Sequence, residues 1–119
     1  LRTVVSKEVP VVLPALTQVE VACALARRLR DPEAARRLAA GVVRGPGVAE
    51  VPLDERLCRS AVRLGTSAFL RAGDAFYAAL AALQGAQLVA WDRDLVDRGA
   101  ALTPETWLGD QATPATGEE

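Results

Sequence analysis

Three carboxylates stand where a parallel β-sheet would present them for chemistry. Glu20 lies one turn into a predicted helix that follows a strand, Asp74 begins an Ala-rich helix, and Asp92 directly follows the apolar segment 88–91. In doubly wound sheets, ligands bind beyond the carboxyl ends of the strands. We therefore take Glu20, Asp74 and Asp92 as candidate site residues, with Asp94 as a neighbour.

Carboxylates that gather in one pocket need a cation. Within about 5 Å of one another, each pair would repel by about 3 kcal/mol at an effective dielectric of about 20. Hard divalent ions prefer oxygen ligands, and Mg²⁺ is commonly bound through one or two carboxylates, waters and substrate phosphate. A bound metal activates water for attack on phosphorus and neutralises charge on the phosphoryl oxygens, so phosphodiester hydrolysis is the natural chemistry.

Each carboxylate also has a purely structural interpretation. Thr17 and Glu20 have the spacing of a capping box, in which Glu20 bonds backbone N–H groups at a helix start. Asp74 fits a plain N-cap. Asp92 and Asp94 fit turn and cap residues. Taken singly, the structural interpretation is the more common one, and only the joint placement of the three residues favours a metal site.

The elements that must position these residues alternate between strand and helix. Asp31 before Pro32 is typical of a helix N-cap, and Gly65-Thr66-Ser67 is predicted to end a helix. Predicted strands cover 9–14, 48–53 and 87–91; predicted helices cover 15–29, 31–43, 54 to the break at 65–67, 74–84 and 94–98, before a last turn at 103–107. This order predicts an α/β fold, a doubly wound parallel sheet with helices on both faces. Residues 1–108 are expected to form one domain and residues 109–119 a disordered polar tail.

Composition narrows the chemistry further. The chain has 119 residues, a net charge of −1 and no histidine, which excludes catalytic triads with histidine, histidine-ligated zinc and a histidine general base. Cys23 and Cys58 lie in predicted amphipathic helices without a CxxC partner, so they are expected to be buried, reduced thiols. No apolar run approaches the roughly 18 residues of a membrane span, and we expect a cytosolic protein without membrane contact.

At the carboxylates the sequence resembles the PIN-domain family, and within it the VapC-type toxin ribonucleases. The segment 13–22 resembles the strand and helix that carry the family's second acidic residue, segment 70–81 is similar to the helix that carries the third, and segment 86–95 is similar to the next strand and the fourth acidic position. Segment 103–108 resembles the closing segment of such domains. The block from Arg71 to Leu95 is the most specific part of the match, and that around Glu20 is weak alone.

The resemblance implies an endoribonuclease that depends on Mg²⁺ or Mn²⁺ and cleaves RNA by metal-activated water. It implies that Glu20, Asp74 and Asp92, with Asp94 beside them, hold the metal. Arg71, three residues before Asp74, is placed to meet a substrate phosphate through its guanidinium. The implied partners are the RNA substrate, a cognate antitoxin protein and a second copy of the chain in a homodimer.

The sequence departs from the family pattern at two places. Ala90 stands where a threonine usually precedes the last aspartate by two residues, so a hydroxyl that could orient the site is lost. The family also begins with a strand that ends in an aspartate, whereas here no Asp precedes Asp31. Residues 1–9 look like the end of the following helix, so about 30 residues, one strand and its crossover helix, are expected to be missing.

Two other classes of protein compete with the nuclease. A catalytically impaired PIN-like module would bind RNA or an antitoxin without cleavage, because of Ala90 or the missing strand. A receiver-like signalling domain is also doubly wound with an acidic pocket, but it needs a lysine after a later strand, and Lys7 is the only lysine in the chain.

Overall fold

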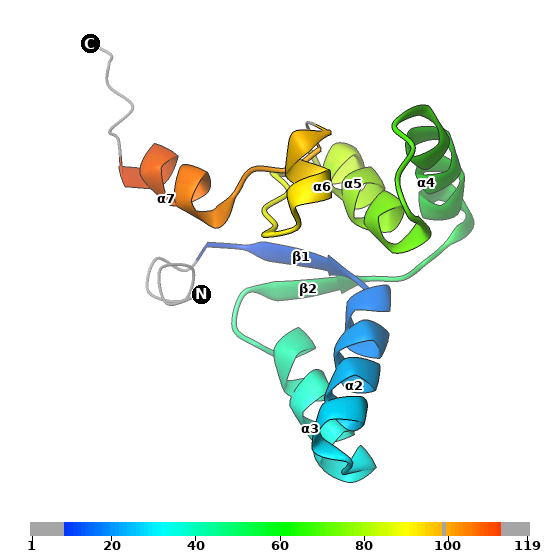
Figure 1. The fold of residues 1–119 in the computed structure, drawn as a ribbon, viewed down its shortest axis with the longest axis vertical. Coiled ribbons are helices and arrows are strands. Elements are labelled where there is room, and N and C mark those ends of the chain that lie inside the picture. The colour runs from blue at the N-terminus through cyan, green and yellow to red at the C-terminus, as the bar shows by residue number, and fades with distance from the viewer. Residues whose placement is uncertain (1–8, 99, 113–119) are drawn as a thin grey trace. The chain divides into compact units, whose positions relative to one another are not determined.

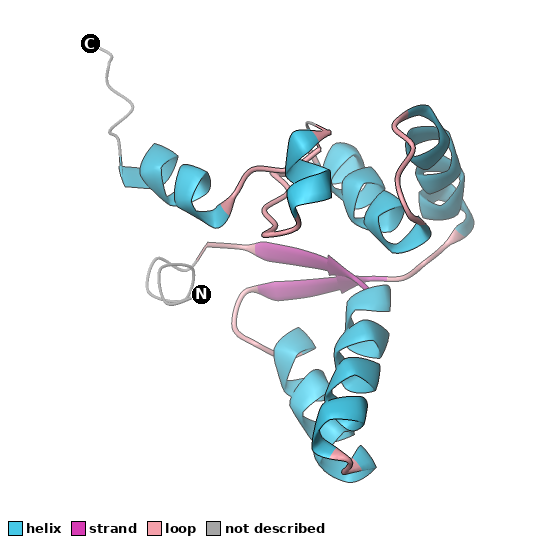
Figure 2. Ribbon diagram, in the orientation of Figure 1, coloured by secondary structure: helices cyan, strands magenta, loops and turns pink. Residues whose placement is uncertain are grey.

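The computed structural model describes residues 9–98 and 100–112. Most of the predicted helix end at 1–9, and positions 113–119 of the predicted tail, lie outside these residues. The chain divides into two compact units, Leu1–Glu55 and Arg56–Glu119. Figure 1 shows the elements in chain order, and Figure 2 shows that the strands belong to the first unit while the second consists mainly of helices.

The first unit is a strand, two helices and a second strand. Strands β1 (Val11–Pro14) and β2 (Val48–Val51) pair in parallel, with Val11 opposite Val48 and Pro14 opposite Val51. Parallel pairing requires a crossover connection, which the helices α2 (Leu16–Leu29) and α3 (Pro32–Val43) supply by packing against each other. Both strands begin and end close to the predicted positions, so the α/β prediction is confirmed here.

The start of α3 follows its sequence signal. The Asp31 side chain accepts a hydrogen bond of 3.1 Å from the backbone N–H of Ala34, and Pro32 occupies the first helical position. One face of α3 buries Ala35 and Ala39. Cap and apolar spacing together therefore place this helix as predicted.

The second unit begins with a close pair of helices, α4 (Glu55–Ser67) and α5 (Ala72–Gln84). Helix α4 ends at Ser67, the last residue of the predicted break Gly65-Thr66-Ser67, and it includes Gly65 and Thr66. The Thr66 hydroxyl donates to the carbonyl oxygen of Val62 at 2.7 Å, which satisfies this polar group inside the helix. A Cβ built on Gly65 would lie 2.8 Å from the Cβ of Ala75, so the glycine serves close helix packing rather than a turn.

The predicted strand at 87–91 is reduced to one parallel bridge between Val89 and Leu102. Ala90 N–H donates to the Leu102 carbonyl oxygen at 3.0 Å, and Leu102 N–H donates to that of Leu88 at 2.9 Å. The short helix α6 (Arg93–Asp97) follows, and α7 (Pro104–Ala112) continues past residue 109, where the disordered tail was expected to begin.

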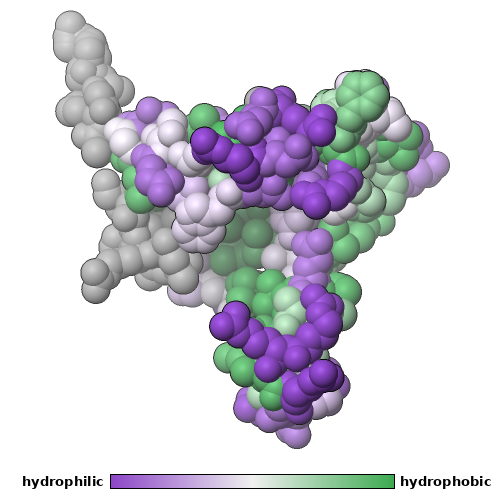
Figure 3. Space-filling view, in the orientation of Figure 1, coloured by the Kyte–Doolittle hydropathy of each residue, from purple (hydrophilic) through white to green (hydrophobic). Residues whose placement is uncertain are grey.

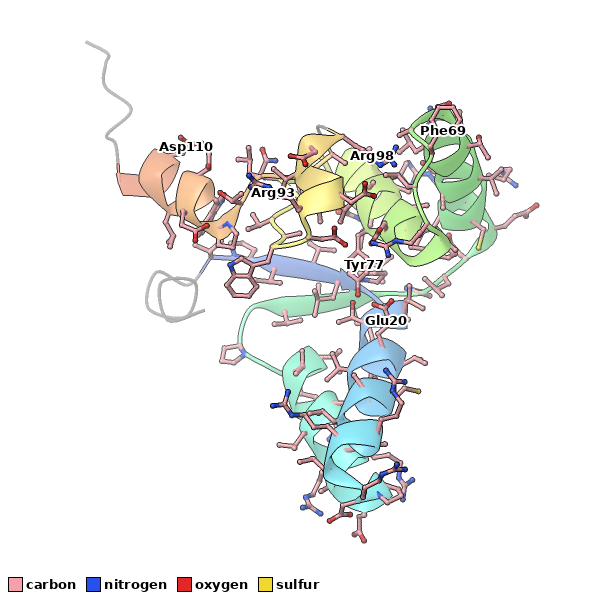
Figure 4. The ribbon with its side chains drawn as sticks, viewed as in Figure 1. Glu20, Phe69, Tyr77, Arg93, Arg98 and Asp110 are labelled. Atoms are coloured by element: carbon pink, nitrogen blue, oxygen red, sulfur yellow. The ribbon has the colours of Figure 1, made fainter. Side chains whose placement is uncertain are left out.

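The expected burial of the cysteines is wrong for Cys23. This residue is exposed on α2, whereas Cys58 on α4 is partly buried, and both thiols are free. Among the described residues, no helix is long and apolar enough to cross a membrane. Figure 3 shows apolar side chains on the surface over α4, and Phe69, labelled in Figure 4, projects from the end of this helix with 79% of its surface exposed.

Candidate metal site at Asp74 and Asp92

Asp74 is the third residue of α5 rather than its N-cap, so the interpretation as a plain cap is wrong. The N-cap position belongs to Arg71, whose side chain makes no capping hydrogen bond. A carboxylate in the first turn is favoured by the partial positive charge of the helix start. The Oδ2 atom of Asp74 is buried and has no hydrogen-bond partner, which marks it as an oxygen available to a cation.

Asp92 is both a cap and a candidate ligand. Its Oδ1 atom accepts a hydrogen bond of 2.9 Å from the backbone N–H of Asp94 and so caps α6. Its Oδ2 atom accepts a hydrogen bond of 3.1 Å from Nη2 of Arg71. The structural interpretation is therefore confirmed for one oxygen, while the other is directed to the site.

Arg71 joins the two carboxylates. Its Nε atom lies 3.4 Å from Oδ2 of Asp74, as an ion pair without a hydrogen bond, and its Nη2 atom lies 3.1 Å from Oδ2 of Asp92. Asp74 and Asp92, which lies 21 positions after Arg71 in the sequence, thus contact the same guanidinium group. The second unit therefore brings three of the predicted site residues together: Arg71, Asp74 and Asp92.

Asp94 has a different partner. Its Oδ1 atom accepts a hydrogen bond of 3.0 Å from Nε of Arg98, while Nη1 of Arg98 donates to the carbonyl oxygen of Ala68 at 3.1 Å. Figure 4 labels Arg98 at the end of α6. Asp94 thus helps tie α6 to the end of α4, and its role as a metal ligand stays a prediction.

Glu20 belongs to the first unit. It is an exposed residue in the first half of α2, as Figure 4 shows. The capping box is wrong, because the N-cap position is Ala15 and Thr17 is a buried residue inside the helix. The joining of Glu20 to the aspartate pair stays a prediction.

The donor set fits a hard divalent cation in part. Two aspartate oxygens face one cationic group, and Mg²⁺ is commonly bound by one or two carboxylates together with waters. Over residues 9–98 and 100–112, no group of three or more His, Cys, Asp or Glu side chains is arranged to hold a metal ion. The pair Asp74 and Asp92 is therefore the part of the site that fits such an ion.

The bridging role of Arg71 was not predicted from the sequence. The spacing of three residues between Arg71 and Asp74 on a helix start is a local signal for their ion pair. The ion pair with Asp92 has no such signal, because it depends on how the segment after Val89 returns to α5.

Comparisons with known proteins agree with this fold. The family model of the PIN domain matches residues 2–101, so the chain belongs to the PIN-domain family, whose members are generally nucleases. The crystal structure of PAE2754 from Pyrobaculum aerophilum is similar to this chain with a TM-score of 0.64 and 31% sequence identity, over 85% of this chain and 76% of that one. No curated protein matches. The predicted PIN-like α/β fold is confirmed.

Proposed function

We propose that the protein is a metal-dependent endoribonuclease of the VapC toxin type. The observation that carries this proposal is the meeting of Asp74 and Asp92 at one cationic group, with a buried Asp74 oxygen that lacks a hydrogen bond. Membership of a family of nucleases supports phosphodiester hydrolysis as the reaction.

Asp74 and Asp92 would hold Mg²⁺ or Mn²⁺, with Glu20 as a further proposed ligand and Asp94 beside them. When bound, such an ion supplies an activated water and neutralises charge that develops on the phosphoryl oxygens. The hydrogen bond that Oδ1 of Asp92 accepts would hold this side chain so that Oδ2 stays in place as a metal ligand. Arg71 would offer planar N–H donors that match a phosphate.

The proposed substrate is single-stranded RNA. Trp91, directly before Asp92, has 81% of its surface exposed, and exposed aromatic rings commonly stack on unpaired bases. The net charge of −1 supplies no general attraction to RNA, so we propose that binding depends on such local contacts. We also propose that the protein is cytosolic, as expected from the sequence.

The proposed protein partners are an antitoxin and a second copy of the chain. Exposed apolar residues on and after α4, Val62 and Phe69, support a protein-binding surface in the second unit. A negatively charged site also suits a basic side chain from an inhibitor.

RNA cleavage with a control for charge tests the enzyme activity. Cleavage of single-stranded RNA should require Mg²⁺ or Mn²⁺, stop with a chelator, and be lost in Asp74→Asn. Asp97→Asn removes the same charge from an exposed residue that pairs with Arg93 at 3.9 Å, so this variant should keep the activity. Cleavage by Asp74→Asn at the normal rate would refute the proposal.

The second candidate is a PIN-like module that binds RNA or an antitoxin without cleavage. It is favoured by the absence of a group of three metal-binding side chains among the described residues and by Ala90 in place of a threonine. RNA binding that is unchanged by Mg²⁺, Mn²⁺ or chelator, with intact RNA throughout, would identify this module.

A further inference from the structure

Arg71 occupies the place where a cation would meet both aspartates. Its guanidinium group puts Nε 3.4 Å from Asp74 and Nη2 3.1 Å from Asp92, on the Oδ2 atom of each. The Asp74 oxygen is buried and accepts no hydrogen bond. The positive charge of Arg71 is therefore what faces this oxygen in the structure.

The guanidinium group is held loosely enough to leave. The Arg71 side chain is 73% exposed, so water screens its charge and weakens its ion pairs. Arg71 also makes no side-chain capping bond to α5, although its backbone provides the N-cap. Departure of the side chain would therefore leave the start of the helix intact.

A divalent ion and the guanidinium group exclude each other at these oxygens. Mg²⁺ coordinates carboxylate oxygens at about 2.0–2.1 Å, so an ion on Oδ2 of Asp74 would stand within a few ångströms of the present position of Nε. Two positive centres at that separation repel strongly. At Asp92 the metal and the guanidinium group also compete for Oδ2, since Oδ1 is already bonded to Asp94 N–H.

We propose that Arg71 is an internal counter-ion that a divalent cation must displace from Asp74 and Asp92. Arg71 thereby sets the metal affinity of the site: it stabilises the aspartate pair without metal, and it weakens metal binding by the cost of its own removal. This inference rests on the proposed metal-dependent function and adds a regulation of the same site.

Mn²⁺ titration, followed by the electron paramagnetic resonance signal of the free ion, measures this competition without any reference to cleavage. Arg71→Gln in the intact chain should bind Mn²⁺ about three- to tenfold more tightly than the wild type, since it loses two ion pairs that the metal otherwise has to break. Arg71→Met keeps the aliphatic stem and should give the same gain.

Arg93→Gln is the matched control. It makes the same change in net charge one residue from Asp92, but Arg93 pairs with Asp97 at 3.9 Å instead of with the site. Its Mn²⁺ affinity should stay within about twofold of the wild type. A gain in Arg93→Gln equal to that of Arg71→Gln would show a general charge effect and overturn the inference.

Two further outcomes separate this inference from the function on which it rests. Equal or weaker Mn²⁺ binding by Arg71→Gln and Arg71→Met would overturn the counter-ion role and leave the metal-dependent nuclease standing. No Mn²⁺ binding by the wild type or by either variant would overturn both proposals together.

Discussion

Gly65 of α4 lies against Ala75 of α5 so closely that a Cβ on Gly65 would stand 2.8 Å from the Cβ of Ala75. Ala75 follows Asp74 directly, and both belong to the first turn of α5. The contact between the two helices therefore fixes the backbone that carries Asp74 with its buried Oδ2 atom. A residue outside the site thus determines where the carboxylate of Asp74, a proposed metal ligand, lies.

The glycine contact gives a prediction about stability. Gly65→Ala should destabilise the protein by about 1–3 kcal/mol, because the added methyl group forces the helices apart. The free-energy cost of this overpacking exceeds the gain in helix propensity. Gly41→Ala is the matched control in α3, where nothing lies within 4 Å of an added Cβ, and it should stabilise by up to about 1 kcal/mol. Urea unfolding of both variants measures the difference, and equal stabilisation by both would contradict the packing role of Gly65.

The two oxygens of Asp92 can be tested separately. Asp92→Asn keeps a good capping side chain, so its free energy of unfolding should stay close to that of the wild type, whereas Asp92→Ala should lose about 1 kcal/mol. RNA cleavage should fall by about two orders of magnitude in both variants, the scale seen when one charge-stabilising group is removed. A large loss of stability in Asp92→Asn would show that the charge, rather than the cap, maintains the fold.

Metal binding should appear as added stability. At about 100 times its Kd, Mg²⁺ or Mn²⁺ should raise the free energy of unfolding by roughly 2.7 kcal/mol. The increase should disappear in Asp74→Asn and persist in Asp110→Asn, which removes a charge from an exposed residue of α7 (Figure 4). Denaturant curves with and without a chelator check this, and a metal-induced increase in Asp74→Asn would exclude Asp74 as a ligand.

Trp91 should contribute to RNA binding. Trp91→Ala should weaken binding of a single-stranded RNA by about 1–3 kcal/mol, the usual value for one base stacked on an aromatic ring. Trp91→Phe keeps a ring and should retain most of the affinity. Fluorescence anisotropy with labelled RNA in a chelator measures binding without cleavage, and an unchanged affinity in Trp91→Ala would remove this residue from the proposed interface.

The parts of the fold that could be predicted are those with local signals. Asp31 and Pro32 mark the start of α3, and the short β-branched runs mark β1 and β2. The continuation of α4 through Gly65 could not be predicted, because a glycine ends a helix or allows close packing according to what lies opposite. The bridge between Val89 and Leu102 likewise depends on a distant partner.

The candidate site was predictable in its residue types and only partly in its contacts. The carboxylates Asp74 and Asp92 both pair with Arg71, and their role as metal ligands stays a prediction. Each capping interpretation had to be decided by structure, since the sequence around Asp74 and Asp92 is compatible with a cap at both. The structure assigns the cap to Asp92 and not to Asp74.

The hydrogen bond from Asp94 N–H to Oδ1 of Asp92 has a consequence for ligand binding. An aspartate that is already immobilised in one rotamer has little side-chain entropy left to lose when its other oxygen accepts a new partner. The ordering penalty of association is thereby met during folding instead of at the moment of encounter. We therefore expect the hydrogen bond from one backbone amide to make Asp92 a preorganised acceptor for a cation.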